Sequence, residues 1–227
     1  MKKVFLILTL FLSCYFIYTK TEGDKKNYLV IGDSLSKGIN EYGVVSYGYS
    51  DFIKDYLENK KILKNYNKTY TDVNYKVSDI VKILEYNESK NNISLNRLIK
   101  EADIITISLG IDEIYYKINK NNQNIYTYID NMISDYNKIL NYISKFHHDK
   151  VYILGYYNTT KNNIDIFNYA NYKIEVLTKK YNYTYIDLAK ILDNNPTYIS
   201  QISNNYMPNI RGYEKISQII VENLKNN

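Results

Sequence analysis

The chain has 227 residues, enough for one domain with a sizeable hydrophobic core. Hydrophobic residues make up 45% and charged residues 23%, a balance that excludes wholesale disorder and a multi-span membrane protein. The formal net charge of +5 is spread thinly, without long basic runs, so we expect no nucleic-acid partner. With a single cysteine, Cys14, the chain forms no intramolecular disulfide and no cysteine-rich zinc site.

The first 26 residues carry the pattern of an export signal. Two lysines precede the apolar stretch 4–18, and a polar stretch, 19–26, follows it. The apolar stretch is short for a spanning helix, which needs about 20 residues. Cys14 follows Phe-Leu-Ser, which resembles the lipobox of bacterial lipoproteins. A lipidated Cys14 and an uncleaved N-terminal anchor both remain open, and either one attaches the chain to the outer face of the cell membrane.

From Tyr28 onward, short apolar runs alternate with helical periodicities. The apolar runs predict buried strands over 28–31, 104–109, 151–154 and 183–186, with a weaker candidate over 69–75. Apolar residues at spacings of three and four predict helices over 52–57, 80–84, 125–146, 169–181 and 213–224. This alternation predicts a single domain over 27–227, a three-layer α/β/α sandwich with a mainly parallel five-stranded sheet.

In such sheets the ligand site lies beyond the carboxyl ends of the strands. Gly32-Asp33-Ser34 directly follows the first predicted strand and precedes a helical segment. A serine at this turn is exposed, and free main-chain N–H groups beside it can bind a developing anion. The alternative is that Ser34 only caps the helix, because serine is a preferred N-cap residue.

Three blocks of sequence share a pattern with a known family. They are Tyr-Leu-Val-Ile-Gly-Asp-Ser-Leu-Ser at 28–36, Ile-Ser-Leu-Gly-Ile-Asp-Glu at 107–113 and Met-Pro-Asn-Ile-Arg-Gly-Tyr at 207–213. In order and spacing they resemble the SGNH, or GDSL, hydrolases, and in detail the extracytoplasmic Firmicutes lipase or acylhydrolase-like lipoproteins. The resemblance implies a flavodoxin-like sandwich, esterase or acylhydrolase chemistry and Ser34 as the nucleophile.

The resemblance also implies an oxyanion hole, built from the N–H of Ser34, a glycine N–H in a second block and an asparagine side chain. We expect Gly32, Asp33, Gly110 and Asp112 to form this oxyanion and substrate-binding region. The segment 72–79, which lies between the first two of the three blocks, offers Asn74 or Tyr75 where the family has this glycine. Asp112 stands in the asparagine position, and an ionised carboxylate donates no hydrogen bond and repels an oxyanion.

The last block departs from the family at both residues that activate the serine. Met207 occupies the histidine position and Asn204 the aspartate position. A thioether accepts no proton at neutral pH, and loss of the base lowers kcat by about 10⁴- to 10⁶-fold. The only histidines, His147 and His148, precede the predicted strand 151–154, at the edge of the sheet opposite the site.

Two acids, Asp112 and Glu113, follow Gly110 in the block 107–113. Only an unusual geometry would bring either to Ser34, so we expect neither to replace the missing base. Together with Asp33 they are expected to be solvated, and no metal or cofactor is expected. We therefore expect an esterase-like protein with weak or lost hydrolysis, whose ligand is a small-molecule or cell-envelope ester or carbohydrate. The alternative is a non-catalytic binding or scaffold module at the cell surface.

Overall fold

The computed structural model describes residues 25–146, 150–159, 162–193, 195–199 and 206–226. Their centre is a five-stranded sheet in the order β2-β1-β5-β6-β7, with every pairing parallel. The strands are β1 (Lys26–Gly32), β2 (Leu63–Thr71), β5 (Ile104–Ser108), β6 (Lys150–Leu154) and β7 (Thr184–Ile186). The predicted parallel α/β/α sandwich is confirmed.

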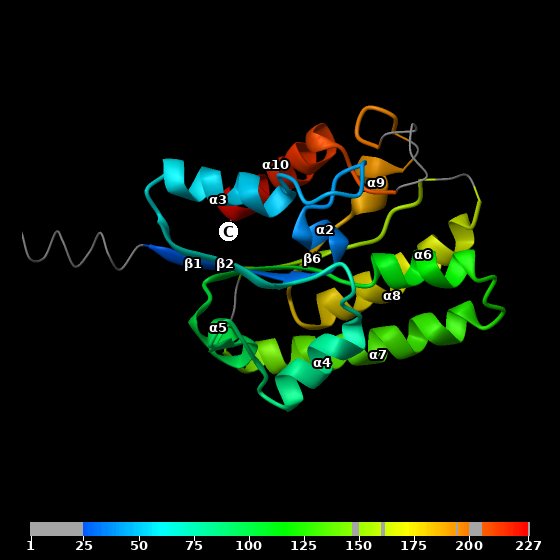
Figure 1. Cartoon of the computed structure of the whole chain (residues 1–227), viewed down its shortest axis with the longest axis horizontal. Helices are drawn as coiled ribbons and strands as arrows, with labels where there is room; N and C mark the ends of the chain where they lie inside the picture. The colour runs from blue at the N-terminus through cyan, green and yellow to red at the C-terminus, as the bar shows by residue number, and fades with distance from the viewer. Residues whose placement is uncertain (1–24, 147–149, 160–161, 194, 200–205, 227) are drawn as a thin grey trace, which may run out of the picture.

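Helices cover both faces of the sheet (Figure 1). One face carries α3 (Tyr49–Asn59), α9 (Leu188–Leu192) and α10 (Ile210–Asn226). The other carries α4 (Val77–Glu85), α5 (Leu95–Glu101), α7 (Ile125–Ile143) and α8 (Ile164–Lys180). A small antiparallel ladder of β3 (Ser89–Lys90) and β4 (Ile93–Ser94) lies between α4 and α5 in the chain.

The three inner strands are buried on both faces because helices cover both sides of the sheet. All five residues of β5 are buried, and so are the last four of β6. Such strands are continuous apolar runs, which is why the sequence predicts them well. Helix α7 continues into a 3-10 turn, Ser144–Phe146, so the predicted helix over 125–146 is confirmed along its length.

The predicted position of β2 is wrong. The strand runs over Leu63–Thr71, whereas the sequence predicted 69–75. It is an edge strand that pairs with β1 alone, and its first seven residues are exposed or half-buried. Polar residues are tolerated there, so no apolar run marks its beginning. After Thr71 the chain turns, and the Tyr75 N–H donates to the Asp72 carbonyl oxygen at 3.1 Å.

Several short helices were not predicted as such. They are α5, α9 and α6 (Ile111–Asn119). The seven residues of α5 and the five of α9 are too few to show a periodic apolar pattern. Helix α6 has nine residues, as α4 does, and was missed because the residues after Gly110 were interpreted as a loop. Among the described helices, none is long and apolar enough to cross a membrane. Residues 1–24, with Cys14 and all but the last two residues of the predicted export segment, lie outside the described part of the chain.

Candidate active site

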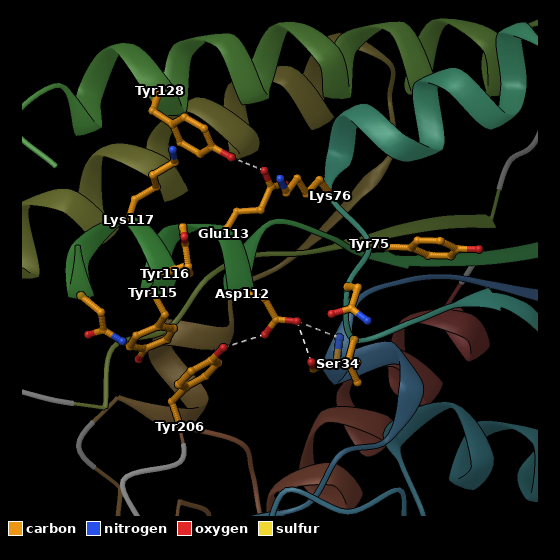
Figure 2. A pocket seen from close by; sticks show the side chains of 13 residues that line it. Ser34, Tyr75, Lys76, Asp112, Glu113, Tyr115, Tyr116, Lys117, Tyr128 and Tyr206 are labelled. Atoms are coloured by element: carbon orange, nitrogen blue, oxygen red, sulfur yellow. Dashed lines mark hydrogen bonds between the residues drawn. The ribbon is translucent and has the colours of Figure 1, made fainter. Parts of the chain in front are cut away.

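A cavity of about 450 Å³ opens beyond the carboxyl ends of β1, β2 and β5, where the sequence predicted a site (Figure 2). Its walls come from the turn after β1, the loop after β2, helices α6 and α7, and the segment before α10. The lining residues are Ser34, Val73, Asn74, Tyr75, Lys76, Asp112, Glu113, Tyr115, Tyr116, Lys117, Asn119, Tyr128 and Tyr206. Tyrosines therefore form much of the wall.

Ser34 is the first residue of the short helix α2 (Ser34–Lys37), and it is only 8% exposed. The N-cap of this helix is Asp33, whose side chain accepts a hydrogen bond from the Leu35 N–H at 3.4 Å. The alternative prediction, that Ser34 caps the helix, is therefore wrong. Its hydroxyl is free for another partner.

Asp33 also joins the turn after β1 to the turn after β5. Its Oδ2 accepts the N–H of Gly110 at 2.8 Å and the N–H of Ile111 at 3.2 Å. The side chain is fully buried. Burial raises the pKa of Asp33 well above its usual range, and the nearby Asp112 raises it further, although the main-chain donors oppose both effects.

Two glycines allow these turns to lie against each other. A Cβ on Gly32 would overlap the carbonyl oxygen of Ser108 and the side chain of Ser36. Gly110 has a φ of +100°, and a Cβ there would lie 2.8 Å from the Met132 Sδ. Gly32, Asp33 and Gly110 thus lie beneath the site, and among the four residues predicted to bind substrate only Asp112 lines the cavity.

Asp112 contacts Ser34 directly, which corrects the expectation that neither neighbouring acid would reach it. The Asp112 Oδ2 accepts a hydrogen bond from the Ser34 Oγ at 2.6 Å and a second from the Ser34 N–H at 3.1 Å. The reason is helix α6, which begins directly after Gly110 and carries Asp112 in its first turn. The sequence did not predict this helix.

Tyr206 holds the other oxygen of the same carboxylate. Its hydroxyl donates to the Asp112 Oδ1 at 2.8 Å. Its ring stacks on Tyr115, with centroids 3.8 Å apart and an interplanar angle of 14°. Burial raises the pKa of Tyr206 far above its ordinary value, so the hydroxyl keeps its proton. Sequence reasoning missed this residue, because nothing local distinguishes it among 28 tyrosines.

Glu113 turns away from Ser34 toward the far side of the cavity (Figure 2). Its carboxylate accepts the N–H of Val77 at 2.8 Å and the hydroxyl of Tyr128. Burial raises the pKa of Glu113, and these two donors lower it. Glu113 therefore ties α6 to the N-terminus of α4 and to α7.

The main-chain donors expected for an oxyanion hole already have partners within the protein. The Ser34 N–H is bonded to Asp112. In the loop after β2, the Asn74 N–H donates to the Asp72 Oδ1 at 3.2 Å and the Tyr75 N–H to the Asp72 carbonyl. Each would have to change partner before it could bind a reacting carbonyl oxygen.

The residues that the sequence analysis assigned to the activating positions are only partly described. Met207 is 2% exposed and follows Tyr206 directly. Asn204, His147 and His148 lie outside the described residues. Within the described part of the chain, no group of three or more His, Cys, Asp or Glu side chains is placed to hold a metal ion.

The sequence of this chain matches the family model of the GDSL-like lipases and acylhydrolases over residues 28–220. The chain belongs to this family. No curated protein matches it. The matched range includes residues of all five strands of the sheet and every residue that lines the cavity, so the resemblance of the three sequence blocks is confirmed.

Solved structures show the same fold for this GDSL-family chain. A lipase from a goat rumen metagenome is 18% identical, with a TM-score of 0.69, over 87% of this chain and 97% of the lipase. An acetylxylan esterase from Geobacillus stearothermophilus is 13% identical, with a TM-score of 0.66, over 87% and 93% of the two chains. The acetyl xylan esterase AlAXEase is 17% identical, with a TM-score of 0.65, over 87% and 99%. At these sequence identities, the similarity to the three structures shows a shared fold and nothing more.

Proposed function

We propose that this GDSL-family chain binds a small-molecule or cell-envelope ester or carbohydrate at Ser34, and that it hydrolyses esters weakly or not at all. The observation that carries the proposal is the Asp112 carboxylate, which accepts both hydrogen-bond donors of Ser34. An active serine esterase uses that N–H to bind the oxyanion of the tetrahedral intermediate. Here the place of the oxyanion is taken by a carboxylate oxygen.

The second support is the residue in the histidine position. Met207 has no nitrogen to accept the serine proton, so Ser34 lacks the base that this family uses. Asn204 stands where the resemblance expects the aspartate that orients the histidine. With both replaced, the ordinary route to an activated serine is absent from the last block.

The ligand class follows from the cavity and the relatives. About 450 Å³ suits a small molecule, and tyrosines on several walls supply flat apolar surface that ends in hydroxyl groups. The related structures include a lipase and acetylxylan esterases, which fits an ester or carbohydrate ligand. A purely non-catalytic binding module is the second candidate, favoured by the engagement of the Ser34 N–H with Asp112.

The proposed place of action is the outer face of the cell membrane. The support is the charged, apolar and polar order of residues 2–26 and the lipobox-like position of Cys14. The mass of the mature N-terminus separates the two attachments. If Cys14 is lipidated, the mature protein begins at Cys14 and lacks the first 13 residues. If the anchor is uncleaved, the protein still begins at Met1. A mature protein with neither a lipid nor the apolar stretch contradicts the proposed attachment to the membrane.

The hydrolytic proposal is tested with a serine-directed fluorophosphonate. We expect Ser34 to react at least about 10³-fold more slowly than the nucleophile of the Geobacillus acetylxylan esterase, because the usual base is lost. Ser34→Ala is the control for site-specific labelling. Labelling of the wild-type protein at the rate of the active esterase, with ester turnover, contradicts the proposal.

A double replacement, Met207→His with Asn204→Asp, tests the cause. If the last block limits the reaction, this variant reacts faster than wild type and remains dependent on Ser34. If its rate equals that of wild type, the limit lies at Asp112 or in the loop after β2.

A further inference from the structure

The carboxylate beside Ser34 has the geometry of a proton acceptor. The Ser34 Oγ donates to the Asp112 Oδ2 at 2.6 Å, within the range over which a general base takes a proton. The other carboxylate oxygen is held by the Tyr206 hydroxyl at 2.8 Å. Ser34, Asp112 and Tyr206 therefore form a chain of hydrogen bonds with the order nucleophile, base and orienting group (Figure 2). Enzymes activate a serine with such an arrangement.

We propose that Asp112 is the general base for Ser34 in the residual ester hydrolysis of this chain, with Tyr206 as a positioning residue. The inference rests on the proposed function only in taking Ser34 as the nucleophile. Asp112 thus takes over the task of the histidine that Met207 replaces.

Each step of this reaction balances. The Ser34 Oγ attacks the carbonyl carbon of an ester, its proton passes to the Asp112 Oδ2, and the carbonyl electron pair moves to oxygen. The intermediate collapses, the bond to the alcohol oxygen breaks, and Asp112 returns the proton to the leaving alcohol. Water then attacks the acyl-serine, gives a proton to Asp112, and the acid leaves as Ser34 regains a proton.

Proton transfer also removes the repulsion that an acid in the asparagine position creates. When Asp112 takes the serine proton it becomes neutral, so the one negative charge moves from the carboxylate to the oxyanion. The Ser34 N–H, which bonds the Asp112 Oδ2 in the free protein, is then released toward that charge. A neutral carboxylic acid can donate a hydrogen bond to an oxyanion, as an amide does.

The surroundings of Asp112 favour a base stronger than an ordinary aspartate. Burial raises its pKa, while the hydrogen bonds from Ser34 and Tyr206 lower it. Asp33 faces it from the turn after β1, and Tyr157, Tyr206 and Tyr213 face it from the segments after β6 and before and within α10. None of the ion pairs between described residues includes Asp112.

The variant Asp112→Asn, made in the full chain, distinguishes a catalytic base at this position from a side chain that only blocks the oxyanion hole. The readout is the Ser34-dependent rate of p-nitrophenyl acetate hydrolysis and of fluorophosphonate labelling. If Asp112 is the base, the rate falls by about 10²- to 10⁴-fold or to the level of Ser34→Ala. If Asp112 only obstructs the oxyanion hole, the amide supplies the missing donor and the rate is equal or higher, which overturns the inference. The matched control is Asp135→Asn on α7, outside the cavity lining.

Tyr206→Phe provides a second, milder variant that keeps the stack on Tyr115. We expect a fall in kcat with little change in KM, because the tyrosine hydroxyl orients the base. The acid limb of the pH–rate profile moves to higher pH, since the charged carboxylate loses a donor. If Tyr206 has only a structural role, the acid limb of the pH–rate profile stays at the wild-type pH. That result contradicts the positioning role.

The outcomes for wild type separate this inference from the proposed function. If the wild-type protein shows no Ser34-dependent reaction, the inference is overturned while the non-catalytic binding form of the proposed function stands. If wild type reacts fast and Asp112→Asn reacts equally fast, both are overturned. A slow, Ser34-dependent reaction that disappears in Asp112→Asn supports both.

Discussion

Two carboxylates beside Ser34 are buried and hydrogen-bonded, yet they differ in what their donors allow. Asp33 accepts main-chain N–H groups of Leu35, Gly110 and Ile111. Asp112 accepts the two donors of Ser34 and the hydroxyl of Tyr206. The partners of Asp33 move only if the turns after β1 and β5 unfold, whereas two of the three donors to Asp112 are side-chain hydroxyls.

Asp33 and Asp112 are the same residue type and both are buried, yet their hydrogen-bond donors give them different roles. Asp33 lies beneath the cavity and fixes the fold around Ser34, while Asp112 lines the cavity and can change partners when a ligand binds. Changes beneath the cavity should therefore appear in stability, and changes at the cavity wall in chemistry. The following variants test that division.

The largest effect on stability is expected for Gly32→Ala. The added Cβ overlaps the Ser108 carbonyl oxygen, a main-chain atom of the neighbouring strand that cannot rotate away. We expect the free energy of unfolding to fall by about 4 kcal/mol, measured by urea denaturation. Gly43→Ala, at a φ of +76° in an exposed turn, is the control and should cost about 1 to 2 kcal/mol. Equal losses for the two variants contradict the overlap.

Asp33→Ala is expected to have the next largest effect. It leaves the buried N–H groups of Gly110 and Ile111 without their acceptor, which costs about 3 kcal/mol of unfolding free energy. Asp33→Asn keeps an acceptor oxygen and should lose about 1 kcal/mol. Urea denaturation measures both. A loss below 1 kcal/mol in the alanine variant shows that Asp33 does not hold the two turns together.

The smallest effect is expected for Asp112→Asn, and it is a gain. Burial raises the pKa of Asp112 in the folded protein, so the folded state binds more protons than the unfolded state between the two pKa values. Stability from this group is fully present below the unfolded pKa of about 3.9 and is lost as the pH rises through the folded pKa. The amide does not titrate and escapes this loss.

We therefore expect Asp112→Asn to melt at a higher temperature than wild type at pH 7 and to lose most of that advantage at pH 4, where the wild-type group is largely protonated in the folded state and lies near its unfolded pKa. Thermal unfolding at pH 4 and pH 7 measures the difference. Because the Asp112 carboxylate also raises the pKa of the buried Asp33, the pH dependence of the difference reports Asp112 together with its effect on Asp33. A variant that gains nothing between pH 4 and pH 7 shows that the carboxylate is not disfavoured in the folded state.

The predictability of each element depends on where it lies. The inner strands β1, β5 and β6 were predicted because burial on both faces requires apolar residues along their length. The edge strand β2 was misplaced because its polar first half faces solvent. Helix α6 was missed because the residues after Gly110 were interpreted as the loop at the end of a strand, although α6 buries Ile111 and Ile114 on one face. The position of Asp112 was therefore missed as well.

The sequence by itself determined the parallel α/β sandwich, the serine turn and the family blocks. These features are local, since each is carried by a few neighbouring residues. Only the tertiary structure decided which groups meet at Ser34. Asp112 is 78 residues from Ser34, and Tyr206 is 94 residues from Asp112. Such contacts follow from the packing of distant turns at one edge of the sheet, which no local pattern encodes.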